Sequence, residues 1–316
     1  LAVALANSKT LTVASGATLN AGTSTISFGT GSPALTINGS LKSANSNGFS
    51  GASNTAINST NSPTFVIGPA ATIEYNAAGA QSVSARTDYA NLTISGSRGG
   101  ATVTLPSAVI GLTGTFAPGA TSVIYSLGTN TFNFKGASQT VPAFDYNNLD
   151  LTGATGTLFG AGTVGIAGTF TPASITASTS GTIDFKGATQ TVPAFSYNNL
   201  DLSGATGTSF AGGTVGVAGS FTPAGITTAS AGTISFNGGG SQSIPTFNYN
   251  NLTVTNTGAN ITLAGSGTVG IAGVFTPGGT SFGTITNSTV SFNGTGGNQN
   301  IPAFTFNNLT VNNSAG

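Results

Sequence analysis

Apolar and polar residues alternate along short segments of about four to seven residues, and Gly, Asn, Ser and Pro separate these segments. In Phe144-Asp145-Tyr146 two rings flank a polar residue, so the rings face one side of a strand and Asp145 faces the other. No segment repeats its apolar residues with the 3.6-residue period of a helix. The pattern therefore predicts an all-β protein.

The alternation changes phase at Asn147-Asn148. Leu149 and Leu151 are out of step with the ring of Tyr146, which predicts a bend at the Asn pair. Asn suits a corner because it tolerates left-handed dihedral angles and can bond its own backbone. We expect the Asn copies of stacked units to form a ladder of side-chain amides.

An internal repeat dominates the chain. Residues 131–181 align without gaps to residues 182–232, and 36 of 51 positions are identical. The phrase Pro-Ala-Phe-x-Tyr-Asn-Asn-Leu, at 142–149, recurs along the chain, and we call it the anchor. Its second aromatic position holds Tyr89, Tyr146, Tyr197, Tyr249 and Phe306, spaced 57, 51, 52 and 57 residues apart. Because Phe replaces Tyr in the last copy, the ring is required and the hydroxyl is dispensable, which favours packing over chemistry.

A second motif, Thr-Val-Gly-Ile-Ala-Gly-Thr-Phe-Thr-Pro at 163–172, recurs at 214–223 and 268–277. A unit of this length is too short for an Ig-like sandwich, which needs about 100 residues. We predict a right-handed parallel β-solenoid (β-helix) built from repeats of about 51–57 residues, with two coils per repeat. Stacked copies would then place identical Phe and Leu side chains in continuous rows.

The repeats also predict the boundaries of the organisation. These are 1–70, irregular N-terminal coils of the same solenoid; 71–130, a divergent repeat; 131–181, 182–232 and 233–288, repeats; and 289–316, an incomplete repeat.

Composition narrows the function classes. The chain has 316 residues with six basic and six acidic side chains, no His and no Cys. It lacks the imidazole base, the thiolate nucleophile and the usual zinc ligands, and so few carboxylates make a calcium cage improbable. Without a basic stripe we expect no nucleic-acid partner, and without a run of 18 apolar residues no membrane-spanning segment. We predict that the protein is not an enzyme and has no catalytic, cofactor-binding or metal-ligating residue.

Several motifs have simple structural interpretations. The segments 160–165 and 265–270 match the GxGxxG pattern of dinucleotide binding, but each leads into a predicted strand, so we interpret these residues as corner glycines. Lys135 and Asp184 are expected on a solvated outer face. Three carboxylates resemble those of a carbohydrate-active enzyme on a β-helix, but their positions hold Ser or Thr in other copies; they are Asp145, Asp150 and Asp201.

Threonine doublets raise the possibility of ice binding. Thr102-x-Thr104 and Thr255-x-Thr257 do not recur at one place in every unit, so strand propensity explains them better. The tripeptide Asn-x-Ser/Thr, a glycosylation acceptor pattern, is expected by chance in such a chain, and it occurs at Asn38, Asn58, Asn251 and Asn308, among others.

Three phrases give the chain a resemblance to a family. Gly-Thr-Ile-Ser-Phe-Asn-Gly at 232–238, Tyr-Asn-Asn-Leu-Thr-Val at 249–254 and Leu-Thr-Val-Ala-Ser-Gly-Ala-Thr-Leu-Asn at 11–20 resemble the beta-strand-repeat surface proteins of Bacteroidota and related bacteria. More loosely, they are similar to filamentous-haemagglutinin-like adhesins. The resemblance implies large secreted or surface-anchored proteins that act as adhesive stalks, filaments or matrix components.

From this we expect a structural and adhesive extracellular protein at the bacterial cell surface. It would be a repeat segment of a fibre, filament or adhesin stalk that acts by stiffness and by self-association, either head to tail or lateral, or by association with a surface. The alternative is a β-solenoid that binds polysaccharide or ice.

Overall fold

The computed structural model describes residues 3–173, 175–256, 260–278 and 282–314. All regular structure in these residues is β, and parallel strands stack in about 14 turns, which defines a β-solenoid. The described residues contain no helix. The predicted all-β parallel solenoid is therefore confirmed.

The chain divides into two compact units, which are described separately. Unit 1 comprises Leu1–Leu158 and Ala173–Ile175, and unit 2 comprises Phe159–Pro172 and Thr176–Gly316. The strands of unit 1 are β1 Val3–Leu5, β2 Thr10–Val13, β3 Thr18–Gly22, β4 Ile26–Phe28, β5 Ala34–Ile37, β6 Ser40–Ser43, β7 Thr64–Ile67, β8 Thr72–Tyr75, β9 Gln81–Ser82, β10 Asn91–Ile94, β11 Thr102–Thr104, β12 Val109–Leu112, β13 Phe116–Pro118, β14 Ile124–Ser126, β15 Thr131–Phe134, β16 Thr140–Val141, β17 Asp145–Tyr146 and β18 Asn148–Asp150, and β19 Leu158–Phe159 lies at the boundary. The strands of unit 2 are β20 Thr163–Ile166, β21 Phe170–Thr171, β22 Thr182–Phe185, β23 Thr191–Val192, β24 Ser196–Tyr197, β25 Asn199–Asp201, β26 Ser209–Phe210, β27 Thr214–Val217, β28 Phe221–Thr222, β29 Thr233–Phe236, β30 Gln242–Ile244, β31 Phe247–Tyr249, β32 Asn251–Val254, β33 Ile261–Leu263, β34 Thr268–Ile271, β35 Phe275–Thr276, β36 Phe282–Thr284, β37 Thr289–Phe292 and β38 Asn308–Val311.

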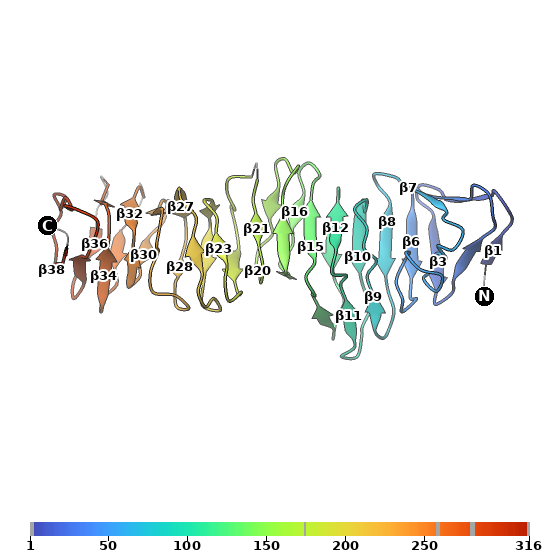
Figure 1. Ribbon diagram of the computed structural model, residues 1–316, viewed down its shortest axis with the longest axis horizontal. Helices are drawn as coiled ribbons and strands as arrows, with labels where there is room; N and C mark the ends of the chain where they lie inside the picture. The colour runs from blue at the N-terminus through green and yellow to red at the C-terminus, as the bar shows by residue number, and fades with distance from the viewer. Residues whose placement is uncertain (1–2, 174, 257–259, 279–281, 315–316) are drawn as a thin grey trace. The chain divides into compact units, whose positions relative to one another are not determined.

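Unit 1 contains a five-stranded parallel sheet in the order β13-β10-β8-β6-β3 (Figure 1). Its register aligns Leu41 with Ile73, Ile73 with Leu92 and Leu92 with Phe116, and all four side chains are buried. Smaller sheets, β14-β11-β9 and β2-β5-β7, form elsewhere in the unit. Each buried row gains apolar contact only when the next turn covers it, so stacking supplies the core.

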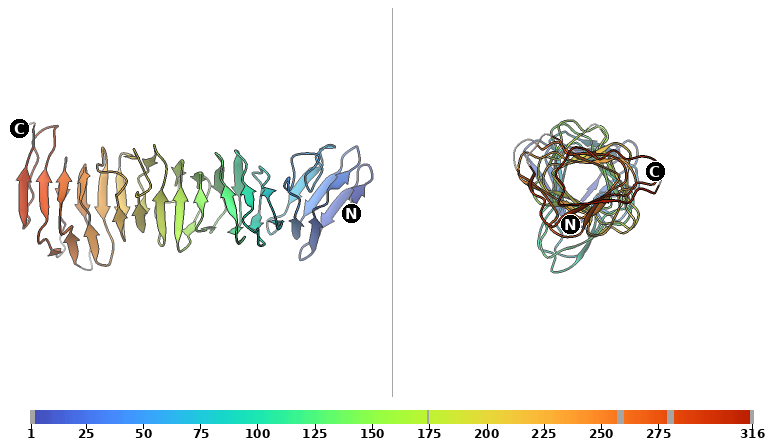
Figure 2. Two further views of the ribbon diagram at one scale, coloured as in Figure 1. Left: turned by 90° about the horizontal axis from the view of Figure 1, so that it is seen from below. Right: turned by 90° about the vertical axis from the view of Figure 1, so that its left-hand side faces the viewer.

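Unit 2 shows how one turn is built. Strands β22, β23 and β24 pair in parallel with β25, β26 and β27, respectively, so three strands make one turn. Figure 2 shows strands of this unit lying side by side along the stack. These pairs join residues 17, 18 and 20 positions apart: Thr182 with Asn199, Thr191 with Ser209, and Ser196 with Gly216.

This turn length corrects one detail of the sequence prediction. Fifty-one residues make between two and three turns rather than two coils of equal length. Thr182 and Thr233 are equivalent in the repeat, yet β22 pairs with β20 and β25, whereas β29 joins the sheet of β24, β27, β32 and β35. Equivalent strands of these copies therefore lie in different stacks, and the expected rows of identical side chains do not form between them.

The anchor forms the corner that its alternation predicts. Strand β24 ends at Tyr197 and β25 begins at Asn199, and both Tyr197 and Leu200 are buried. The ring of Phe195 packs edge-on against Tyr197, with centroids 4.9 Å apart. Phe247 and Tyr249 repeat the contact at 5.0 Å. The inward placement of the anchor rings is thus confirmed.

Candidate functional site

The two GxGxxG segments lie at corners that lead into strands. Residues 160–165 run into β20 and residues 265–270 run into β34. Gly162 and Gly267 have φ values of 103° and 83°, in the left-handed region that glycine adopts most easily. Their interpretation as corner glycines is confirmed.

The predicted carboxylates serve the strand ends. One side-chain oxygen of Asp150 accepts from the backbone N–H of Thr152, and Asp201 does the same for Ser203, each at 2.8 Å. Asp145 is exposed on β17. Side-chain capping of a turn is the ordinary structural use of Asp at such positions.

A carboxylate pair that sequence reasoning missed lies on β22 and β25. Asp184 and Asp201 are register partners on these adjacent strands. Lys186 lies 3.7 Å from Asp184, and its charge offsets the repulsion between the two carboxylates. Lys135, in unit 1, donates to the backbone carbonyl of Thr87.

The threonine doublet of unit 1 does not form a Thr array. Thr102 and Thr104 on β11 are paired with Ile124 and Ser126 on β14. Of the other doublet, Thr257 lies outside the described residues. Among the acceptor Asn residues, Asn38 is exposed, and the side chain of Asn251 bonds to the backbone of neighbouring turns, donating to Gly232 and accepting from Val274.

A recurring glutamine forms the first of two polar ties between turns. Oε1 of Gln190 accepts from the N–H of Gly187. Its Nε2 donates to two carbonyls one turn earlier, those of Ile166 at 2.9 Å and Gly168 at 2.6 Å. The chain has five Gln residues, and all five make this set of contacts; they are Gln81, Gln139, Gln190, Gln242 and Gln299. We call this arrangement the Gln clamp.

Sequence reasoning missed the Gln clamp, although a signal was present. Each Gln follows an aromatic residue that ends a strand, and the intervening corner varies in length from Gly-Ala-Ser at 136–138 to Gly-Thr-Gly-Gly-Asn at 294–298. A residue type kept while its neighbours change in type and number has a role of its own.

The second Asn of the anchor forms the other tie. Nδ2 of Asn199 donates to the carbonyl of Gly181 in the preceding turn at 3.1 Å, and Oδ1 accepts from the N–H of Ser220 in the next turn at 2.8 Å. Asn91 connects Ala71 and Thr115 in the same way. We call this the Asn tie. It replaces the expected amide ladder, because each Asn bonds to backbone rather than to another Asn.

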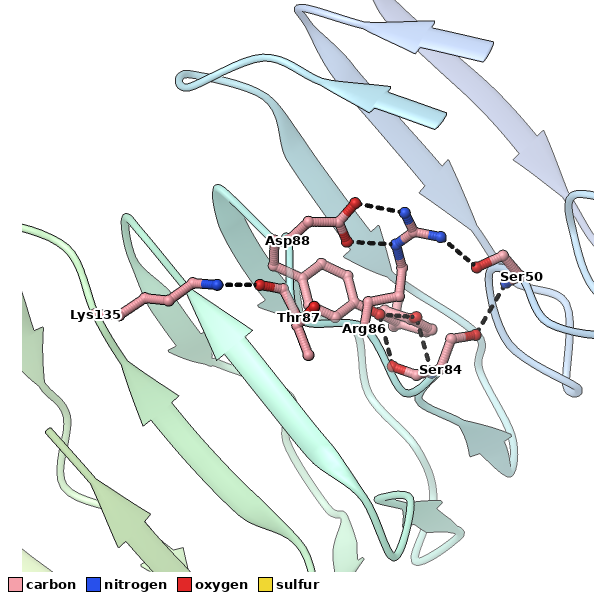
Figure 3. A network of polar contacts seen from close by, with 8 residues as sticks. Ser50, Ser84, Arg86, Thr87, Asp88 and Lys135 are labelled. Carbon is pink, nitrogen blue, oxygen red and sulfur yellow. Dashed lines mark hydrogen bonds and ion pairs between the residues drawn. The ribbon is translucent and has the colours of Figure 1, made fainter. Parts of the chain in front are cut away.

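A charged cluster in unit 1 is the densest polar network of the described residues shown in Figure 3. Arg86 donates to both carboxylate oxygens of Asp88, at 2.8 and 2.6 Å, and to the hydroxyl of Ser50 at 3.1 Å. Its guanidinium lies 4.3 Å from the ring centroid of Phe65 and 5.6 Å from that of Phe49. Bidentate pairing and ring stacking together hold Arg86 in place.

Two buried tyrosines lie beneath this cluster. The hydroxyls of Tyr75 and Tyr89 are 2.7 Å apart, and Tyr89 donates to the carbonyl of Ser84 at 2.9 Å. Burial raises the pKa of Tyr75 and raises that of Tyr89 further. Both hydroxyls stay protonated at neutral pH, so they act as hydrogen-bonding groups and not as bases.

Arg98 is the most deeply buried charge of unit 1, with 1% of its surface exposed. It donates to the carbonyls of Tyr75 at 2.8 Å and Gly79 at 3.1 Å, and to Oε1 of Gln81 at 3.0 Å. Burial lowers the pKa of Arg98, which nevertheless remains charged because the ordinary value is so high. Arg98 thus braces the first Gln clamp.

These arrangements hold backbone to backbone, and no reactive group is aimed at a cleft among the residues just described. The described residues contain no group of three or more acidic side chains that could hold a metal ion. They also include no long apolar helix of the kind that crosses a membrane. Comparisons with protein families, curated proteins and solved structures found no match. Fold and ties together define a β-solenoid repeat protein.

Proposed function

We propose that this protein is a structural and adhesive repeat segment of a fibre, filament or stalk at the bacterial cell surface. The observation that carries the proposal is that Gln clamps and Asn ties recur in both units. Each tie joins a corner or a strand to the turn before it, the turn after it, or both.

The ties favour stiffness for a mechanical reason. In a parallel stack the backbone hydrogen bonds run from strand to strand, which is the direction in which the turns stack. A load in that direction would stretch these bonds together. The corners lie between the strands and lack such pairing, and the Gln clamps add hydrogen bonds there, so corners and strands resist the load together.

The surface chemistry supports association. Only 4% of the residues are charged, so like-charge repulsion between copies is weak and the hydroxyl and amide surface can make many neutral contacts. The resemblance to beta-strand-repeat surface proteins supports the extracellular location. No catalytic step is part of this proposal.

The described aromatic residues give little support to polysaccharide binding. Carbohydrate recognition by stacking needs exposed rings, and no Phe or Tyr is among the exposed large apolar side chains of the described residues. The pairing of Thr102 and Thr104 with Ile124 and Ser126 likewise gives no flat Thr array for ice. We therefore favour structural association over these alternatives.

Electron microscopy of the purified 316-residue chain, at low and moderate concentration in physiological salt, tests the proposal. Continuous fibres with a regular axial repeat would identify a filament subunit. Separate rods of uniform length would identify a stalk segment. Compact globules would contradict a mechanical role.

Single-molecule pulling tests the ties themselves. We expect Gln190→Leu to lower the unfolding force of one part of the chain, because three hydrogen bonds at one corner are lost. Thr191→Ala is the matched control, since Thr191 is the next residue and is exposed. Equal forces in the two variants would remove the link between ties and strength.

A further inference from the structure

The outer edge of β38 differs from that of its equivalents. Strand β38 pairs with β37, and in it Leu309 is 44% exposed and Val311 is 60% exposed. The equivalent residues of β32, Leu252 and Val254, are fully buried. The two side chains of β38 therefore have the type and spacing of core residues but lie in contact with solvent.

The equivalents of β38 show what covers such an edge. In three internal copies, the Asn-Leu strand is paired in parallel with a strand that begins with Phe. The pairs are β10 with β13, β25 with β28, and β32 with β35, and they align Leu92 with Phe116, Leu200 with Phe221, and Leu252 with Phe275.

The residue before each Phe is selected by the Asn tie. The backbone N–H groups of Thr115, Ser220 and Val274 donate to Oδ1 of the Asn, at 2.9, 2.8 and 2.8 Å. The three side chains differ, so this position supplies backbone only.

The position before that one must be glycine. A Cβ at Gly219 would collide with Oδ1 of Asn199, and a Cβ at Gly273 would collide with Oδ1 of Asn251. The same collision would occur at Gly114. The covering strand therefore has the form Gly-x-Phe, and it continues as Thr-Pro or Ala-Pro in all three copies, at 114–118, 219–223 and 273–277.

We propose that the outer edge of β38 is an acceptor site for an extended Gly-x-Phe-Thr-Pro strand, which adds in parallel beside it. Asn308 would accept from the N–H of residue x, and Leu309 would be covered by the Phe ring. Strand addition at a sheet edge combines backbone hydrogen bonds with a side-chain pocket, which gives both affinity and selectivity. The inference rests on the proposed role as a repeat segment, because the site joins one piece of this architecture to another.

A labelled peptide with the sequence of residues 272–278, Ala-Gly-Val-Phe-Thr-Pro-Gly, tests the site on the full chain by fluorescence anisotropy. We expect saturable binding. Peptides in which Gly273 is replaced by Ala, or Phe275 by Ser, should bind at least about tenfold more weakly, which corresponds to about 1.4 kcal/mol or more. Equal binding of all three peptides would overturn the proposal.

Two protein variants locate the binding. Asn308→Ala should weaken peptide binding at least about tenfold, because it removes the acceptor of one hydrogen bond and the group that selects Gly. Thr310→Ala is the control and should leave affinity within about twofold, because Thr310 lies between the two covered residues and points away from them. Both side chains are exposed, so neither change is expected to disturb folding.

Amide hydrogen exchange identifies the edge that is used. In the internal copies the N–H of the Leu donates across the pair, from Leu92 to Thr115 and from Leu200 to Ser220, each at 2.9 Å. Bound peptide should therefore slow exchange at Leu309, whereas Asn308, whose N–H already donates to Ser288, should not change.

The outcomes separate this inference from the proposed function. Peptide binding without slower exchange at Leu309 would overturn the acceptor site. Slower exchange that depends on protein concentration and not on peptide would also overturn it, and would assign the edge to a second copy. Compact globules in the micrographs would contradict the proposed mechanical role without affecting peptide binding.

Discussion

The side-chain amide of Gln190 donates to the backbone carbonyl of Ile166, one turn earlier, at 2.9 Å. At this corner β22 has ended and β23 has not begun, so backbone groups lack the partners that a strand provides. Buried backbone groups must be paired, and Gln190 serves Gly168 and Gly187 as well. The side chain thus continues between the strands what the sheet does within them.

Removal of this side-chain amide should be costly. We expect Gln190→Leu to lower the free energy of unfolding by about 2–4 kcal/mol, because buried polar groups left without a partner cost about 1–3 kcal/mol each. Urea denaturation followed by circular dichroism measures the change. Thr191→Ala should stay within about 0.5 kcal/mol of the parent, as is usual for an exposed position. Equal losses in both variants would show that the Gln clamp has no special role.

A pair of glycines tests the Asn tie. Gly219→Ala should lower the free energy of unfolding by about 1–3 kcal/mol, because the new Cβ collides with Oδ1 of Asn199 and the tie to Ser220 must shift. Gly212→Ala is the matched control, since no atom lies within 4 Å of a Cβ built there.

The control should be neutral or should stabilise by about 0.4–1 kcal/mol, because Ala restricts the unfolded chain. Thermal denaturation of both variants side by side gives the comparison. A Gly219→Ala protein as stable as Gly212→Ala would mean that the Asn tie contributes nothing.

The fold was predictable because its signals are local. Alternation around Asp145 and the change of phase at Asn147-Asn148 gave the strands and the corner, and the length of the repeat excluded a sandwich. Comparison of copies also showed that the ring of Tyr197 faces inward. Each of these features depends on residues that are neighbours in the chain.

The relation between copies was not predictable in this way. Thr182 and Thr233 lie in different stacks because a turn is 17 to 20 residues long and 51 is not a multiple of that length. Turn length depends on corner geometry, which alternation does not reveal. The Gln clamp was missed for a related reason, since the partners of Gln190 lie about 22–24 residues earlier, where no sequence pattern marks them.

The two kinds of buried tyrosine should respond differently to loss of the hydroxyl. Tyr197 makes one bond, to the carbonyl of Pro193 at 3.2 Å, and Phe306 occupies the equivalent position, so Tyr197→Phe should cost about 0.5–1.5 kcal/mol. Tyr89→Phe removes bonds to Tyr75 and Ser84 and should cost about 1.5–3 kcal/mol. Chemical denaturation measures both, and a larger loss for Tyr197→Phe would contradict this order.

Alkaline pH should unfold the protein through its tyrosines. Burial raises the pKa of Tyr75, Tyr89, Tyr146, Tyr197 and Tyr249 above the ordinary value of 10, and that of the half-buried Tyr125 is raised as well. Below pH 10 these groups are protonated in both states, so their contribution to stability is fully present. Above pH 10 the unfolded chain loses protons that the folded chain retains, so stability falls as pH rises through the raised values.

Ultraviolet absorbance of tyrosinate and circular dichroism, recorded on the same sample, test this directly. We expect little ionisation while the β signal persists, and then a joint transition in which absorbance rises as the β signal is lost. The chain unfolded in guanidinium is the control and should titrate near pH 10. Smooth titration of the tyrosines near pH 10 with an unchanged β signal would show that the hydroxyls are not enclosed by the stacked turns.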